Sequence, residues 1–398
     1  GPRMYPQPSH HDSRRVQPPA RRLSPLQRLW RAGCAAATAL AVASLYAPAA
    51  ASAEVIRIGI SAPLTGIQAA SGKDVVEHLQ AGLAELRARG DFGEHKVELI
   101  ALDDGYDVNR TVANVRQLVA EKRVHLVLNQ IGSAHAAAIV PVLQSSGVTL
   151  FAPLSGPRSL YADNLRPTVV PLRASYADEV RQQIRTLAAT GVDRVSLVYQ
   201  DDAFGQDILK AWQELATEAN VKLVSSFPVA RGSSAVEAPV EAALNSGAGA
   251  VVLALVSSPA LAGTLQIRKR AGNRVYAVLM SVAVTSEVIA GLATSDSRGA
   301  VLFSSVMPIP TGGGSRLLKG YADLRKKYEL KPSFRGLEAF VSLQIVAAEL
   351  RKLTRVTPQT LGASLAQATG FSVADLYMPT RNSTRYADVF AITKHGLL

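Results

Sequence analysis

Short runs of β-branched and aliphatic residues recur along the chain from Val55 onward. Polar or glycine-containing stretches separate the runs, which is the pattern of strands buried on both faces. We therefore expect strands at residues 55–60 (VIRIGI), 97–102 (VELIAL), 125–130 (HLVLNQ), 148–153 (VTLFAP), 194–199 (RVSLVY), 250–256 (AVVLALV), 276–281 (YAVLMS) and 300–306 (AVLFSSV).

Between these runs, apolar residues return with helical spacing. Strands that alternate with such segments predict an α/β fold with doubly wound parallel sheets. Breaks in the pattern near residues 169–176 and 304–314 indicate that the chain leaves one lobe and later returns to it. The clearest helical segments are 72–90 and 109–122, whose apolar faces hold Val75, Leu79, Leu83 and Leu86 in the first and Val112, Val115 and Val119 in the second.

Residues 1–53 have a different composition. Arginine, proline and serine come first, and an alanine-rich apolar run then ends in Ala51, Ser52 and Ala53. A basic n-region, an apolar stretch and a small-residue site are typical of a secretory signal peptide. We expect residues 1–3 to be a cloning scar and cleavage to follow Ala53. The alternatives are an ordinary alanine-rich helix and an uncleaved anchor.

Cleavage at this point would change the charge and the cysteine content. It would remove Cys34, the only cysteine of the 398 residues, so neither a disulfide nor a thiolate metal site is expected. It would also remove 7 of the 43 basic and 1 of the 31 acidic residues, leaving 36 against 30 and a net charge of +6 instead of +12. Lysines and arginines do not cluster with aromatics, so a nucleic-acid partner is not expected. The remaining length, with 48% hydrophobic residues overall, suits two lobes.

Two pairs of adjacent aspartates follow expected strands, Asp103-Asp104 and Asp201-Asp202. Neighbouring side chains of an extended segment point in different directions, so Asp201-Asp202 does not suit acid–base catalysis. Aspartates before a helix cap its free N–H groups, and this is the favoured role of Asp201-Asp202. A hard metal ion would require more converging oxygen ligands, and no metal site is expected.

Two other loops carry a hydroxyl group beside a glycine, Gly132-Ser133 and Ser155-Gly156. Free N–H groups at a helix start, together with hydroxyl groups, suit a carboxylate. Ser133 could instead serve only as a helix cap. Neither loop matches a phosphate-binding pattern, so we expect no nucleotide and no other cofactor.

Aromatic residues follow the same strand ends. Phe204 lies in the turn after residues 194–199, where an aromatic ring can form one wall of a small-molecule pocket. Ser175 and Asp178 are spaced for a capping box, and Tyr176 between them could also face a cleft. The sequence contains neither a His-Glu-x-x-His nor a Gly-x-Ser-x-Gly motif, so an enzyme is not expected.

From about Glu54 to its C-terminus, the chain resembles the type I periplasmic solute-binding proteins of the branched-chain amino acid (Leu/Ile/Val-type) ABC transporter family. The motifs that carry the resemblance, in this order, are IRIGISAPLTG, LDDGYDVNRTVANVRQLV, GSAHAAAIVPVLQSSGVTLFAP, RASYADE, YQDDAFGQDIL and SSVMPIP. The resemblance implies a periplasmic, monomeric, non-enzymatic protein that closes two lobes on a ligand and docks on the membrane permease of an ABC importer. Three crossovers would join lobe 1 (54–173 plus 308–375) to lobe 2 (174–307 plus 376–398).

The resemblance also implies a set of ligand contacts. Hydroxyl and N–H groups of Ser133 and of Leu154-Ser155-Gly156 would bind a carboxylate, and Phe204 resembles the aromatic residue that lines the cleft in the family. The candidate ligand-binding residues are Gln68, Ser133, His135, Leu154, Ser155, Gly156, Tyr176, Phe204, Ser257 and Ser281. Gln68 and Tyr176 are secondary candidates among them.

The departures from the family pattern concern the ligand's amino group. Relatives that bind amino acids carry an acidic residue after the strand that matches YAVLMS, whereas here no acid occurs before Glu287. An unpaired ammonium in a closed cleft is costly, so we expect a carboxylate without an amino group or a neutral amide. Asp202 could replace the missing acid if it points inward. A ligand-sensing receptor coupled to a regulatory partner is the alternative function, and an exported hydrolase lacks a visible nucleophile.

Overall fold

The computed structural model describes residues 55–293, 300–381, 384–393 and 396–397. The expected signal peptide and its cleavage site lie outside these residues. Within the described part of the chain, no helix has both the length and the apolar character needed to span a membrane.

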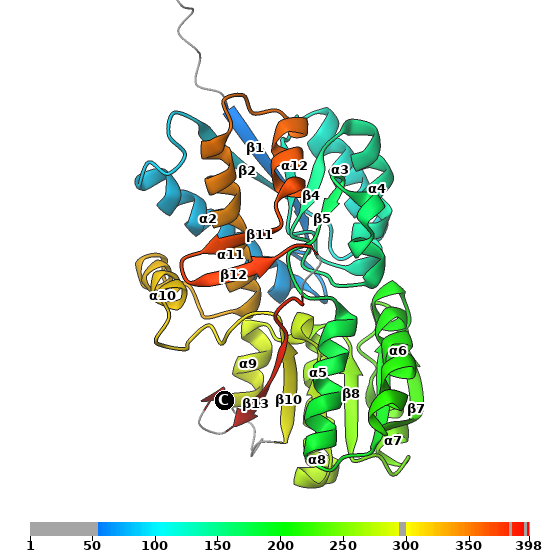
Figure 1. Cartoon of the computed structure of the whole chain (residues 1–398). Helices are drawn as coiled ribbons and strands as arrows, with labels where there is room; N and C mark the ends of the chain where they lie inside the picture. The colour runs from blue at the N-terminus through cyan, green and yellow to red at the C-terminus, as the bar shows by residue number, and fades with distance from the viewer. Residues whose placement is uncertain (1–54, 294–299, 382–383, 394–395, 398) are drawn as a thin grey trace, which may run out of the picture. The chain divides into compact units, whose positions relative to one another are not determined.

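Lobe 1 contains a five-stranded parallel sheet in the order β2-β1-β3-β4-β5 (Figure 1). β1 pairs with β2 on one side and with β3 on the other, so the strand order reverses beside β1. The strands are β1 (Val55–Ala62), β2 (Lys96–Asp103), β3 (Leu126–Leu128), β4 (Thr149–Phe151) and β5 (Val169–Val170).

Lobe 2 repeats this order and adds two strands. Its sheet runs β14-β13-β10-β9-β8-β6-β7, and the five strands from β10 to β7 are parallel. β13 is antiparallel to β10, so the sheet is not purely parallel as expected, because the chain re-enters this lobe from the opposite direction. The strands are β6 (Arg194–Gln200), β7 (Lys222–Val229), β8 (Ala250–Ala254), β9 (Tyr276–Leu279), β10 (Val301–Ser305), β13 (Asp388–Thr393) and β14 (Gly396–Leu397).

Helices cover both faces of each sheet, which confirms the doubly wound α/β class. In lobe 2, Val195 and Leu197 of β6 pack with α5 and α6, whereas Val198 packs with the cluster that holds α7, α8 and α9. Figure 1 shows α3 and α4 on one side of the first sheet and α2 with α11 on the other. The helices are α2 (Ala69–Ala88), α3 (Val108–Ala120), α4 (Ser133–Ser146), α5 (Tyr176–Ala189), α6 (Ala203–Leu215), α7 (Glu237–Leu244), α8 (Ser257–Ala271), α9 (Ser286–Ala293), α10 (Arg316–Tyr328), α11 (Phe334–Lys352) and α12 (Pro358–Gln367).

The chain passes between the lobes three times: after β5, after β10 and after β12. The first two passages contain the expected boundaries at 173/174 and 307/308. The third differs from the expected boundary at 375/376. β12 (Leu376–Pro379) pairs with β11 (Gly370–Val373), and Phe371 of β11 packs edge-on against Phe151 of β4. Residues 376–379 therefore belong to lobe 1, and the crossing begins only after Pro379.

Candidate ligand-binding cleft

A small cavity lies where the carboxyl ends of the strands in both sheets meet, which is the usual ligand position in open α/β sheets. The space open to the centre of a water molecule is about 10 Å³, which is about what one water molecule needs. A larger solute can therefore enter only when the lobes separate. Lobe 1 contributes Gln68, Tyr106, Ile131, Gly132, Ser133, Leu154 and Arg335 to its wall, and lobe 2 contributes Tyr176, Phe204, Val256 and Val282.

Half of the candidate residues line this cavity: Gln68, Ser133, Leu154, Tyr176 and Phe204. Ser155 and Gly156 lie directly behind it, because the Ser155 hydroxyl contacts both Ser133 and Tyr176 and the carbonyl of Gly156 accepts from the Tyr176 N–H. His135, Ser257 and Ser281 are buried, and each is bonded to neighbouring protein groups.

Three hydroxyl groups meet at one end of the cavity. The Oγ atoms of Ser133 and Ser155 are 2.8 Å apart, and the Tyr176 hydroxyl lies 3.4 Å from Ser155 Oγ. Gly132 takes the N-cap position of α4, and Ser133 is the first residue of the helix, with its hydroxyl group directed to Ser155. The first turn of α4 contains no acidic residue, and the positive end of its dipole is therefore not neutralised from within the helix.

The backbone before α4 requires a glycine. Gly132 has a φ of 96°, a value that residues with side chains rarely adopt. A Cβ atom at this position would also lie 2.0 Å from Nδ1 of His135. This conformation lets the chain turn directly from the strand end into the helix start that lines the cavity.

Aromatic rings form much of the wall. Tyr176 and Phe204 meet edge to face with ring centroids 5.3 Å apart. Phe204 is positioned by the start of α6, where the Asp202 carboxylate accepts from the N–H groups of Phe204 and Gly205. Tyr106 is a third aromatic residue of the wall, and the sequence analysis missed it. These rings favour a solute with a flat or apolar body.

The aspartate pairs have structural roles. Asp202 caps α6 and also accepts from Gln200 and Arg231, so it is not available to replace the missing acid of the family pattern. Asp104 is fully buried and accepts from the hydroxyl groups of Ser61 and Thr111. Among the described residues, no three His, Cys, Asp or Glu side chains gather into a possible metal site.

His135 lies behind Tyr106 and contacts lobe 2. Its ring is 4.5 Å from the Tyr106 ring, and its Nε2 is 3.0 Å from Nη2 of Arg231, which also donates to the carbonyl of Tyr106. Because arginine can only donate, Nε2 must accept and the imidazole is neutral. Burial and the charge of Arg231 lower the pKa of His135 below its ordinary value.

The remaining serines connect elements across the molecule. Ser257 Oγ of lobe 2 donates to Oε1 of Gln68 in lobe 1 at 2.9 Å. Ser281 does not line the cavity: its Oγ donates to Glu179 at 2.9 Å and accepts from Nη2 of Arg173 at 2.8 Å. Ser257 and Gln68 thus bridge the lobes, and Ser281 belongs to a polar network beside the first crossing.

Arg335 is the functional candidate that the sequence analysis missed most clearly. It is 1% exposed, lines the cavity, and donates from Nη1 to the carbonyl of Leu154 and from Nη2 to the carbonyl of Val282. Burial and the nearby charge of Arg173 lower its pKa. Arg173 itself pairs with Glu338, one turn after Arg335 in α11, at 3.0 Å. The sequence signal was the motif FRGLEAF, in which two opposite charges stand among apolar residues at the start of a helix.

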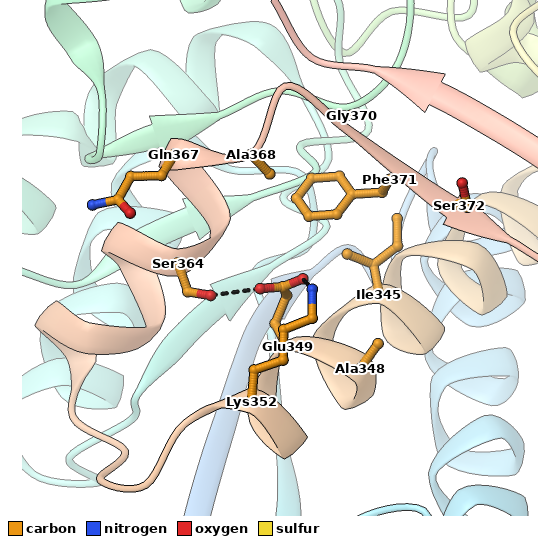
Figure 2. A pocket seen from close by; sticks show the side chains of 10 residues that line it. All are labelled: Ile345, Ala348, Glu349, Lys352, Ser364, Gln367, Ala368, Gly370, Phe371 and Ser372. Carbon is orange, nitrogen blue, oxygen red and sulfur yellow. Dashed lines mark hydrogen bonds and ion pairs between the residues drawn. The ribbon is translucent and has the colours of Figure 1, made fainter.

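A second pocket, shown in Figure 2, lies within lobe 1 between α11, α12 and β11 and has a volume of about 470 Å³. It contains none of the candidate residues. Its carboxylate, Glu349, is already held by Lys352 at 2.7 Å and by Ser364 at 2.5 Å. This pocket lies away from the strand ends where the two lobes meet.

Comparison with known sequences and structures agrees with this geometry. The Leu/Ile/Val-binding protein homolog 7 of Brucella abortus (strain 2308) is 24% identical over 197 residues, 47% of this chain and 49% of that protein. The match thus spans about half the length of that curated relative.

Among solved structures, a possible leucine/isoleucine/valine-binding protein from Rhodopirellula baltica SH 1 superposes with a TM-score of 0.80 at 22% identity, covering 87% of this chain and 96% of that one. A branched-chain amino acid transporter substrate binding protein from Streptococcus pneumoniae, in complex with isoleucine, gives 0.75 at 17% identity, with 86% and 98% covered. An ABC transporter solute binding protein from R. palustris, in complex with 4-hydroxybenzoate, gives 0.76 at 15%, with 86% and 95% covered.

These likenesses show the fold of a two-lobed binding protein. The sequence pattern of the periplasmic binding protein family extends over residues 55–389, which is most of the chain. The chain therefore belongs to the periplasmic binding protein family, of the type I fold with branched-chain-amino-acid-binding relatives.

Proposed function

We propose that this protein captures a small carboxylate- or amide-bearing solute outside the cytoplasm by closing its two lobes, and delivers it to the membrane permease of an ABC importer. The observation that carries the proposal is the buried cavity, because its wall comes from strand ends of both lobes. A solute held there contacts both lobes at once and so stabilises the closed arrangement over an open one.

Different parts of the cavity wall contact the polar and the apolar part of the solute. The hydroxyl groups of Ser133 and Ser155, with the N-terminus of α4, bind the solute's carboxylate or amide oxygen. The rings of Tyr106, Tyr176 and Phe204 enclose its apolar body. Ser257 and Gln68 join across the cleft beside it.

The relatives bind two kinds of solute, and the wall favours one of them. The protein from S. pneumoniae holds isoleucine and the one from R. palustris holds 4-hydroxybenzoate. Among the described residues that line the cavity here, none is acidic, so an ammonium group would have no carboxylate partner. An aromatic or short aliphatic acid, or its amide, fits better than an amino acid.

The test is a thermal-shift screen of residues 54–398 after unfolding and refolding to remove any solute carried through purification. The panel contains amino acids, amides, and aromatic and aliphatic carboxylates. A solute at a hundredfold excess over its dissociation constant stabilises the folded form by about 2.7 kcal/mol, and the transition temperature rises accordingly.

Ser133→Ala combined with Ser155→Ala should abolish the shift, whereas Ser145→Ala, an exposed serine at the far end of α4, should leave it intact. A panel without any shift contradicts the proposal. Uptake of the bound solute is then compared between cells with and without the gene. Loss of uptake without the gene supports the importer role, whereas unchanged uptake supports the sensor.

A further inference from the structure

The guanidinium of Arg335 is a buried cation in the cleft wall without a carboxylate of its own. It is 99% buried, and it donates to the carbonyl groups of Leu154 at 2.7 Å and Val282 at 3.3 Å. Its Nε has no hydrogen-bond partner. Carbonyl dipoles compensate only part of a buried charge, and a cation in such a position is costly unless an anion approaches it.

The acids nearest to the cleft are already committed. Glu338, one helical turn further along α11, binds Nε of Arg173 at 3.0 Å. Glu179 accepts from the Ser281 N–H and from the hydroxyl groups of Ser281 and Ser304. Asp202 binds Arg231 and caps α6. None of these three carboxylates lines the cavity.

Two independent features thus make the cavity electropositive. One is Arg335, and the other is the N-terminus of α4 at Gly132 and Ser133, whose first turn has no acidic residue. Arg335 is the only charged residue among the described side chains that line the cavity. An anion would gain from both features, whereas an ammonium group would meet repulsion and find no partner.

We propose that Arg335 selects the charge of the solute: the cleft takes an organic carboxylate that carries no ammonium group, and discriminates against both its amide and its α-amino derivative. This rests on the proposed function and narrows it. The planar fork of an arginine matches a carboxylate, and a buried pair of this kind is lost almost entirely when one partner becomes neutral.

The experiment uses probes that differ in one group. 4-Methylpentanoate, 4-methylpentanamide and leucine share one branched skeleton, and benzoate and benzamide share one ring. Dissociation constants are measured by calorimetry on the refolded protein. We expect at least one of the two carboxylates to bind at least about 100-fold more tightly than its amide, and 4-methylpentanoate more tightly than leucine by a similar factor.

Variants of Arg335 then test whether this residue causes the preference for a carboxylate over its amide. Arg335→Gln should weaken carboxylate binding by about 100-fold or more and leave amide binding within about threefold, so that the ratio between them collapses. Arg335→Lys keeps the charge without the fork and should retain part of the ratio. The matched control is Arg158→Gln, which removes another arginine that bridges the lobes, through Asp207 and Glu214, outside the cavity wall. It should change both affinities by the same factor.

The outcomes separate this inference from the proposed function. Leucine or an amide bound as tightly as the matching carboxylate would overturn the role of Arg335 while leaving solute capture in place. Equal losses for carboxylate and amide in Arg335→Gln would show that the residue only holds the lobes together. Binding of none of the probes, and of no small molecule recovered from the unrefolded protein by mass spectrometry, would overturn both.

Discussion

At the scale of single residues, His135 lies in surroundings that oppose its protonation. Burial and Arg231 lower its pKa from 6.5, while Asp104 and Asp202 act more weakly in the opposite sense. The unfolded chain therefore takes up a proton near pH 6.5 that the folded protein does not bind. The resulting stability is fully present above pH 6.5 and is lost as the pH falls below it.

We expect the free energy of unfolding to decrease between pH 7 and pH 5, by up to about 1.4 kcal/mol per pH unit for each such histidine. Burial also lowers the pKa of His78, so it contributes with the same sign. Urea unfolding of His135→Gln across this range should give a flatter pH profile, and the double variant with His78→Gln a flatter one still. An unchanged slope in the single variant would contradict the assignment.

The sequence could place some cleft residues and not others. Ser133, Ser155 and Phe204 lie in the connections that follow β3, β4 and β6. The carboxyl ends of parallel strands converge, so the proximity of these residues follows from the strand pattern. Arg335 lies in a long helix and meets Leu154, which is 181 positions away in the chain. No local pattern indicates that contact, and only the two charges among the apolar residues at the start of the helix mark the residue as unusual.

At the scale of elements, the two lobes use the same joint between their first strand and the helix that follows it. Gly72 in α2 lies against the carbonyl oxygen of Pro63, and Gly205 in α6 lies against that of Gln200. A Cβ atom would be 1.9 Å and 1.7 Å from these oxygens, respectively. Gly205 is thus required for the close approach of the helix to the strand end.

Gly205→Ala should destabilise the protein by about 1–3 kcal/mol or more, because backbone rather than a flexible side chain must move. The same substitution at Gly320, an exposed position of α10 with no atom within 4 Å of a new Cβ, should stabilise it by roughly 0.5–1 kcal/mol. Denaturant midpoints of the two variants should therefore move in opposite directions from the parent. Equal effects would show that helix propensity alone governs both positions.

Most of the elements followed from hydrophobic patterning because the central strands are buried on both faces. All eight expected strands are present, although β3 and β4 are only three residues each. The pattern missed β7, an edge strand in which Ser225 and Ser226 replace apolar residues and Pro228 is tolerated. It also missed the two-residue strand β5 and the short strands from β11 to β14. β11 pairs with β12 and β13 with β14 as neighbours in the chain, and only the pairing of β13 with β10 joins distant segments.

At the scale of the whole molecule, bonds on several sides of the cleft hold the lobes together. Asp74 of α2 accepts from the hydroxyl group of Ser286 at 2.7 Å and from its N–H at 3.1 Å, at the start of α9 in lobe 2. In the proposed opening of the lobes these bonds would break, so they would favour the closed arrangement.

Ser286→Ala should favour opening by about 1 kcal/mol, because one of the two bonds to Asp74 is removed. The affinity for any solute should then fall by roughly fivefold, without a change in selectivity. Calorimetry with several solutes measures this, and small-angle scattering should show a larger radius of gyration before solute is added. A selective loss for one solute would place Ser286 in recognition instead.

The order of the crossings has a consequence for how the chain comes to be made. Lobe 1 lacks α11, which packs against α2, until residues 334–352 exist, and the sheet of lobe 2 lacks β13 until residues 388–393 exist. Neither lobe can complete its packing until these segments, which follow nearly all of its other elements, have been synthesised. A chain whose lobes are completed so late remains unfolded long enough to be translocated. We expect this chain to leave the cytoplasm before it folds, so the late completion of both lobes is an advantage.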